Sequence, residues 1–292
     1  FSEFSRLSIE YAQALAQEFR AALSLVNVVA PPVKLAGTGS LLLARSDDQV
    51  FKIEKRHLSK LAVKLSGKGK PIKPISRYGK AVKEITEAAR EEGMDLIVTG
   101  THGYTGLKRV LIGSTAEGVV RHAPCPVITV PAECAEKFSG KRWAARIRKI
   151  VVPIDFSEAS LKALPYALEF AKRFRAEVVL VHVIEPVAGY GAYDYVPTPA
   201  VEAEMKRAAE ELLSRVQREA FPERTCTEVM IRYGVPFQEI ARAVTHCEGD
   251  LLILTTHGLT GFSHALLGST AERVVRHASC PVLVVRDRKA DS

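Results

Sequence analysis

The chain reads Val98-Thr99-Gly100-Thr101-His102-Gly103-Tyr104-Thr105-Gly106 and, 155 residues further on, Ile253-Leu254-Thr255-Thr256-His257-Gly258-Leu259-Thr260-Gly261. The first stretch runs on to Gly113-Ser114-Thr115-Ala116-Glu117, and the second runs on to Gly268-Ser269-Thr270-Ala271-Glu272. Each copy predicts an apolar strand, a glycine-rich loop and the start of a helix. A loop of this kind at a helix amino terminus is suited to binding a phosphate.

The offset of 155 residues holds along the whole chain without an insertion. A solenoid would repeat every ~20–50 residues, so this offset indicates a tandem duplication of one domain. We predict a first domain at residues 1–131, a charged surface linker at 132–147 and a second domain at 148–292. Residues that coincide at this offset are Phe1 with Phe156, Pro31 with Pro186, Tyr78 with Tyr233, Asp95 with Asp250, and Arg121 with Arg276.

The second copy predicts alternating strands and helices. This alternation is typical of a doubly wound α/β fold, a parallel sheet with helices on both faces and right-handed crossovers. The predicted strands are 148–155, Glu177–Ile184, 227–232, 250–254 and 281–285. The predicted helices are 160–175, 201–220, one after Pro236, and Ser269–His277, with Ser157 as a helix cap.

The first copy lacks the counterpart of its first strand, because Phe1 aligns with Phe156. That strand is expected at the centre of the sheet, and without it two neighbouring strands would have unpaired edges. We therefore expect either that residues precede Phe1 or that the first domain is an incomplete sheet.

The composition is that of a globular protein, with 47% hydrophobic and 25% charged residues. Neither an apolar run of about 18 residues nor a signal-peptide pattern occurs, so no membrane partner is expected. Five cysteines without CxxC spacing favour a reducing, cytoplasmic location. The net charge of +8 is concentrated at residues 52–83 and 137–149, which contain only the aromatic residues Tyr78, Phe138 and Trp143 and lack the repeated interleaving typical of base stacking. We interpret these regions as solvated surface and expect no nucleic-acid partner.

The glycine loop offers a binding site for a phosphate. Ser114 with Glu117, and Ser269 with Glu272, match the S-x-x-E capping box, and a glycine stands directly before each. In doubly wound sheets ligands bind at the carboxyl ends of strands, so Asp155 is placed to face the second loop and bind ribose hydroxyls. Each element alone also has a structural explanation, as a turn glycine or an ordinary helix cap.

The spacing Gly100-x-x-Gly103, nine residues, Gly113-Ser114 resembles the nucleotide-binding signature of the universal stress protein family. Val-Pro-Ile-Asp155, His182-Val183 and the Arg-His-Ala-x-Cys-Pro segments are similar to other hallmarks of that family. The resemblance implies two tandem five-stranded parallel sheets in the order 3-2-1-4-5, an adenine-nucleotide alpha-hydrolase-like fold. It also implies ATP or AMP binding in many members and pairing of domains through their last strands. Here that pairing would be intramolecular, through Val127–Val130 and Val282–Val285, and a further homodimer would add to it.

The resemblance implies a set of nucleotide-binding residues in each copy. The two sets differ in which of the family's residues they contain. Thr255 replaces the first signature glycine in the second copy, where a β-branched residue resists positive φ and adds bulk. The first copy keeps its glycines but lacks the opposing Pro and Asp, and we favour it if only one half binds and its first strand exists. The first set is Val28, Gly100, Thr101, His102, Gly103, Gly113, Ser114 and Thr115. The second set is Pro153, Asp155, Val183, Gly258, Gly268, Ser269 and Thr270.

No catalytic constellation accompanies these residues. His102 and His257 invite a general-base role, but neither a nucleophile nor a Walker-type Lys accompanies them, so a loop-stabilising role is favoured. We expect a stress-response regulatory protein that binds ATP, ADP or AMP, with Mg alongside the nucleotide and at most slow hydrolysis. The alternatives are a non-nucleotide dimerisation scaffold of the same fold, and an adenine-nucleotide enzyme of related architecture.

Overall fold

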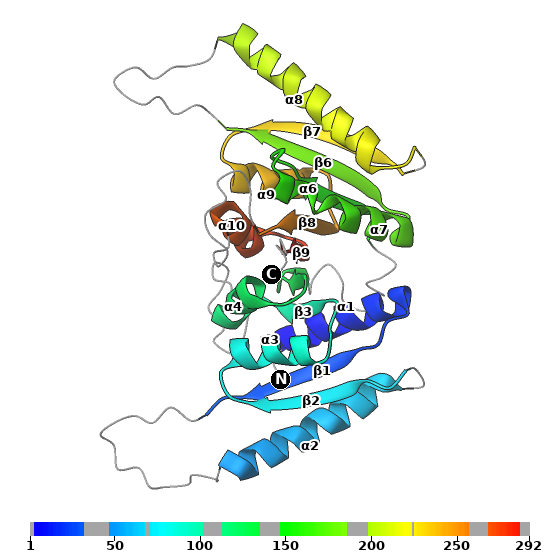
Figure 1. Ribbon diagram of the computed structural model, residues 1–292, viewed down its shortest axis with the longest axis vertical. Coiled ribbons are helices and arrows are strands. Elements are labelled where there is room, and N and C mark those ends of the chain that lie inside the picture. The colour runs from blue at the N-terminus through cyan, green and yellow to red at the C-terminus, as the bar shows by residue number, and fades with distance from the viewer. Residues whose placement is uncertain are drawn as a thin grey trace, which may run out of the picture.

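The structure is a computed structural model that describes residues 3–31, 47–67, 70–101, 113–134, 147–185, 198–223, 225–256 and 268–286 (Figure 1). The first copy contains α1 (Glu3–Phe19), β1 (Ser24–Val29), α2 (Asp47–Ser66), β2 (Lys73–Tyr78), α3 (Ala81–Glu91), β3 (Ile97–Gly100), α4 (Ser114–His122) and β4 (Val127–Val130). The second contains β5 (Lys149–Pro153), α6 (Glu158–Leu161), α7 (Leu164–Phe174), β6 (Glu177–Ile184), α8 (Pro199–Ala220), β7 (Thr227–Tyr233), α9 (Pro236–His246), β8 (Leu251–Thr255), α10 (Ser269–His277) and β9 (Val282–Val285).

The second copy forms the predicted sheet. Its strands lie in the order β7-β6-β5-β8-β9, which is 3-2-1-4-5 in chain order, and neighbouring strands are parallel. Residues 150–152 of β5 are fully buried, as expected of a central strand covered on both faces. The predicted α/β fold class is confirmed.

The last strands of the two copies lie side by side and antiparallel, with Ile128 of β4 opposite Leu283 of β9. This seam joins β3 and β4 to the second copy in one seven-stranded sheet, as Figure 1 shows. Side chains on each face of the sheet form a core that crosses the seam. One core joins α1 to α7, and the other joins α4 to α9 and α10.

Among its described residues the first copy has no strand at the position that β5 fills in the second. Within the described residues, β1 pairs only with β2 in a separate two-stranded sheet, and β3 pairs only with β4.

The predicted helix 160–175 is wrong in one respect, because it is broken into α6 and α7. Pro165 is the second residue of α7, and a proline has no N–H to donate to the carbonyl of Leu161 one turn earlier. The first copy has Glu10 at the equivalent position, and there α1 continues unbroken for 17 residues. Ser157 caps α6 as predicted, since its Oγ accepts a hydrogen bond from Ser160 N at 3.0 Å.

Thr129 of β4 places a hydroxyl in the seam without a hydrogen-bond partner among the described residues, and its side chain is fully buried. The second copy has Val284 at the equivalent position. We expect Thr129→Val to raise the free energy of unfolding by about 1 kcal/mol, because it removes an unsatisfied buried polar group at nearly constant shape. Urea denaturation followed by circular dichroism measures this change. The reciprocal Val284→Thr should lower stability, and a loss of stability in Thr129→Val would contradict the assignment.

No helix in the described part of the chain is long and apolar enough to span a membrane.

Candidate functional site

Each glycine loop is closed at its base by one hydrogen bond between the backbone at the end of a strand and the start of a helix. In the second copy Gly268 N donates to Thr256 O at 2.8 Å, just beyond β8. In the first copy Gly113 N donates to Thr101 O at 2.6 Å, just beyond β3. These bonds fix the amino ends of α10 and α4 beside the carboxyl ends of the strands.

The capping-box interpretation is wrong in both copies. The N-cap residues are Gly113 and Gly268, neither helix has a side-chain cap, and the serines are the first helical residues. Glu117 and Glu272 instead accept hydrogen bonds at 2.8 Å from arginines one turn later in their helices. Among the described residues no side chain caps either helix, and the first N–H groups of a helix, which have no partner within it, attract an anion.

Asp155 lies directly beyond β5, at the same edge of the sheet. Its Oδ1 accepts hydrogen bonds from Ser157 N at 3.0 Å and from Ser157 Oγ at 2.6 Å. These bonds fix the carboxylate at the start of α6. Phe156 between them has a positive φ of 64°, which turns the chain sharply toward the helix.

His182 of β6 supports this turn from the neighbouring strand. Its Nδ1 lies 2.7 Å from Ile154 O, so this ring nitrogen donates to the carbonyl. The ring also packs on Phe156, with centroids 4.5 Å apart. His182 therefore positions the backbone around Asp155, a role that the sequence analysis did not assign to it.

The other end of β5 is fixed by charge. Asp250 Oδ2 accepts hydrogen bonds from Arg148 N at 2.8 Å and Lys149 N at 3.1 Å. Lys149 Nζ also lies 3.1 Å from a carboxylate oxygen of Glu177, and this hydrogen bond raises the pKa of the lysine. These contacts hold β5 in place between β6 and β8, and so hold Asp155 at the opposite edge.

A cavity of about 170 Å³ lies at this edge of the second copy. Its lining brings together the six described residues of the second predicted set: Pro153, Asp155, Val183, Gly268, Ser269 and Thr270. It also includes Thr256 and Glu185, which the predicted set omitted. Glu185 stands directly after the strand that ends at Ile184, so its place at the carboxyl edge was the available signal.

Thr255 does not introduce the backbone strain that its sequence position suggested. It is the last residue of β8, pairs with Val285, and is absent from the described residues with positive φ. A β-branched residue readily adopts the extended conformation of a strand. The substitution of the signature glycine therefore does not distort the loop base, although the Thr255 side chain does line the cavity.

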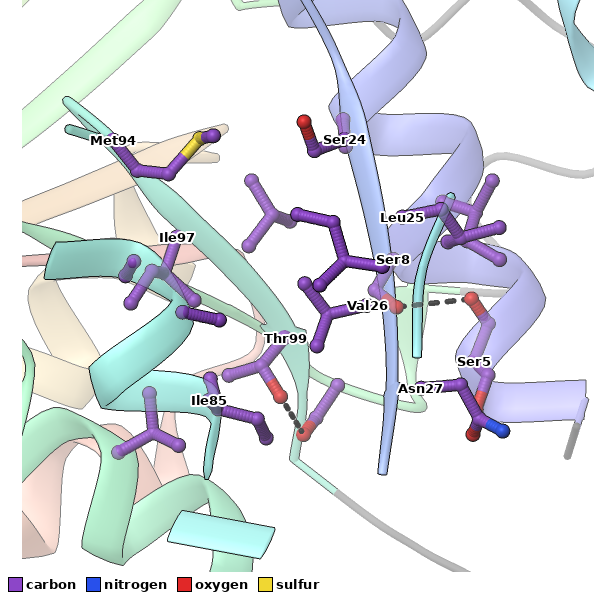
Figure 2. Close-up of a pocket in the computed structure, with 18 of the residues that line it drawn as sticks. Ser5, Ser8, Ser24, Leu25, Val26, Asn27, Ile85, Met94, Ile97 and Thr99 are labelled. Carbon is purple, nitrogen blue, oxygen red and sulfur yellow. Dashed lines mark hydrogen bonds between the residues drawn. The ribbon is translucent and has the colours of Figure 1, made fainter. Parts of the chain in front are cut away.

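The first copy brings its predicted residues to a larger cavity of about 610 Å³. Gly100, Thr101, Gly113, Ser114 and Thr115 line one end of it, while Val28 does not belong to its lining. The cavity then extends inward between β1 and β3, as Figure 2 shows. His102, Gly103 and Gly258 of the predicted sets lie outside the described residues, as does His257. No cluster of three metal-ligating side chains occurs within the described ranges.

The fold and the loop bases define a tandem, doubly wound α/β protein with a crevice beside a helix amino end in each copy. The chain belongs to the universal stress protein family, whose sequence profile matches residues 1–131 and 146–286. A universal stress protein of Mycolicibacterium smegmatis is 27% identical over 97% of this chain and 94% of its own length. Universal stress protein MJ0531 of Methanocaldococcus jannaschii is 36% identical over 49% of this chain and 85% of its own. The crystal structure of a universal stress protein from Archaeoglobus fulgidus shares the fold, with a TM-score of 0.68 at 21% identity over 99% of this chain and 96% of that one.

Proposed function

We propose that the crevice of the second copy binds an adenine nucleotide, and that the protein acts as a nucleotide-dependent regulatory protein of the stress response. One observation carries the proposal. The carboxylate of Asp155, which follows β5, and the amino end of α10, which follows the neighbouring strand β8, line the same cavity. A fixed carboxylate accepts hydrogen bonds from ribose hydroxyls, while a helix amino end with an uncovered glycine cap attracts phosphate.

The carboxylate and the helix amino end would bind different parts of the nucleotide. The backbone of Gly268, Ser269 and Thr270 would receive the phosphates, and Val183 on β6 would lie against the base. The phosphate oxygens of the nucleotide would coordinate a magnesium ion. The crevice of the first copy offers the same kind of helix end, lined by Gly113, Ser114 and Thr115, and is the second candidate site for a nucleotide.

A titration with two nucleotides tests the assignment. We expect Asp155→Asn to weaken ATP binding about tenfold or more, because a hydrogen bond to a charged acceptor contributes about 1.5–3 kcal/mol. Asparagine keeps the oxygen that accepts from Ser157, so the turn at α6 is retained. Isothermal titration calorimetry of both proteins with ATP measures the change.

The matched control is 2′,3′-dideoxy-ATP, which has no ribose hydroxyls for Asp155 to bind. The substitution should leave its affinity almost unchanged. Equal losses for both nucleotides would place Asp155 elsewhere than at the ribose, and no heat at millimolar ATP with the unaltered chain would exclude the nucleotide site itself.

The seam between β4 and β9 favours a second candidate function, that of a dimerisation scaffold. Ile128 and Leu283 are almost fully buried there, so the fold joins two copies without any ligand. In that case a bulky residue at Gly113 or Gly268 would leave the stress-related activity of the protein unchanged. Survival of stressed cells that carry Gly268→Trp distinguishes the two functions.

A further inference from the structure

An arginine of the second copy lies beside the crevice that we propose as a nucleotide site. Arg273 of α10 places its guanidinium over the ring of Phe237 in α9, with Cζ 5.1 Å from the ring centroid. This distance is within the range of a cation–π interaction. The ring is partly buried against the core beneath the two helices, and it also packs on His277, with ring centroids 5.9 Å apart. The stacking therefore holds an exposed cation in one place.

Helix geometry directs this cation toward the crevice. A helical side chain leans toward the amino end and covers the residues three and four positions earlier, which for Arg273 are Thr270 and Ser269. Both of these residues line the cavity, and so does Pro236, the first residue of α9 and the neighbour of Phe237. Figure 1 shows α9 and α10 side by side. Arg273 thus lies where both helices begin beside the cavity.

The electrostatic environment of Arg273 favours an anion. The amino ends of α9 and α10 each carry a positive partial charge. The carboxylates in the first turns of these helices, Glu239 and Glu272, already pair with arginines of their own helices, Arg242 and Arg276. A further cation next to two helix amino ends is stabilised when a negatively charged group, such as a phosphate, binds beside it.

The first copy has no side chain at the equivalent position. Gly118 of α4 corresponds to Arg273, and Val82 of α3 corresponds to Phe237. An added Cβ at Gly118 would lie 2.5 Å from Cγ2 of Val82, so α3 and α4 approach too closely there to admit an arginine without a shift. The two copies therefore share a glycine-capped helix but differ in the charge beside its first turn.

We propose that Arg273 binds the terminal phosphates of the nucleotide and makes the second copy selective for a triphosphate over a monophosphate. This inference rests on the proposed nucleotide site. The first phosphate would lie at the amino end of α10, and the phosphate chain beyond it would reach the guanidinium. Stacking on Phe237 uses the face of the guanidinium and leaves its N–H donors in the plane, where they can form two parallel hydrogen bonds to phosphate oxygens.

The size of the cavity agrees with a phosphate chain that leaves it. Its volume of about 170 Å³ is below the range of about 300–1,000 Å³ that is usual for ligand pockets. A triphosphate anchored at Ser269 therefore extends past the edge of the cavity, on the side of the helix that Arg273 covers. Gly118 offers no such contact in the first copy, so we expect that copy to discriminate less between the two nucleotides.

Calorimetric titration of the 292-residue chain with ATP and with AMP tests this selectivity. We expect Arg273→Gln to weaken ATP binding about tenfold, because a charge-assisted hydrogen bond to phosphate is lost. The affinity for AMP should change less than about twofold, because its single phosphate is bound by backbone N–H groups of α10. Equal losses for both nucleotides would show a structural role for Arg273 and would overturn the proposal.

The matched control is Arg173→Gln. Arg173 is also exposed and also stacks on a phenylalanine, with Cζ 5.8 Å from the ring centroid of Phe19. It lies in the last turn of α7, which leads into β6, and so at the opposite edge of the sheet from the crevice. Loss of this charge should change both affinities less than about twofold, because solvent and salt screen charges at that distance. A loss of ATP affinity as large as that in Arg273→Gln would mean that net charge, not a contact, determines the preference.

The same titrations separate this inference from the nucleotide site itself. If the unaltered chain gives no heat with either nucleotide, the site is wrong and the inference fails with it. If it binds both, and Arg273→Gln keeps the same preference for ATP, the site stands and Arg273 has no part in selectivity.

Amide hydrogen exchange assigns the contact to one copy. ATP should slow exchange at residues 269–272 more in the unaltered chain than in Arg273→Gln, because the contact holds the phosphate chain at this helix end. Protection by ATP at residues 114–117 alone would place the nucleotide in the first copy and would overturn the proposal. Arg273→Lys should recover only part of the ATP affinity, since an ammonium group cannot form two parallel hydrogen bonds to a phosphate.

Discussion

Replacement of Leu180 by alanine should lower the free energy of unfolding of the second copy by about 2–5 kcal/mol. Leu180 lies at the middle of β6 with Val152 of β5 on one side and Val229 of β7 on the other, and its side chain is fully buried. Truncation removes apolar contacts and leaves a cavity that strands fixed on both sides cannot close. Native-state hydrogen exchange of the β5, β6 and β8 amides measures the loss copy by copy, since a two-copy chain need not unfold in one step.

The duplication supplies a matched control at Leu25, the equivalent leucine of the first copy. Leu25 pairs with Pro74 of β2, lines the cavity of the first copy, and is only half-buried. Leu25→Ala should therefore cost less than about 2 kcal/mol. Equal losses at the two positions would show that Leu25 is packed as tightly as Leu180, and would contradict the cavity beside Leu25.

A charge at Ile128 should lower the free energy of unfolding even more. Ile128 is fully buried in the seam opposite Leu283, and its side chain belongs to the core that joins both copies. We expect Ile128→Asp to cost more than about 4 kcal/mol, because the aspartate has no cation to pair with inside an apolar core. Urea denaturation followed by circular dichroism, together with protease susceptibility of β4 and β9, measures the effect.

Two substitutions separate charge from size in this experiment. Ile128→Val removes one methyl group and should cost about 0.5–1.5 kcal/mol. Val63→Asp adds the same charge at a position that is 75% exposed, and should change stability by less than about 0.5 kcal/mol. An Ile128→Asp protein as stable as the Val63→Asp protein would mean that the seam is open to water.

The duplication explains why so much of the fold could be predicted. Once residue 103 is aligned with residue 258, the elements of the second copy from β6 onward each predict one in the first, and α4 and β4 begin and end at the residues expected from α10 and β9. Buried parallel strands such as β6 are almost uniformly apolar, so their bounds can be read from composition alone.

The predictions from sequence that were wrong failed for local physical reasons. S-x-x-E predicts a capping box, but the same Glu117 can pair with Arg121 one turn later, and the cap position is already taken by a glycine fixed by its backbone bond. The proline that breaks α6 from α7 was visible in the sequence, yet the apolar stripe outweighed it in the prediction. The site was harder to predict, because Val183 lines the cavity of the second copy whereas its equivalent Val28 does not line the cavity of the first.

The seam between β4 and β9 has a consequence for how the protein responds to dilution. Two separate chains that paired through such strands would come apart once their concentration fell below the dissociation constant. Here both strands belong to one polypeptide, so their pairing is intramolecular and does not depend on the protein concentration. The paired state should therefore persist at the few copies per cell at which a two-chain assembly would be largely dissociated.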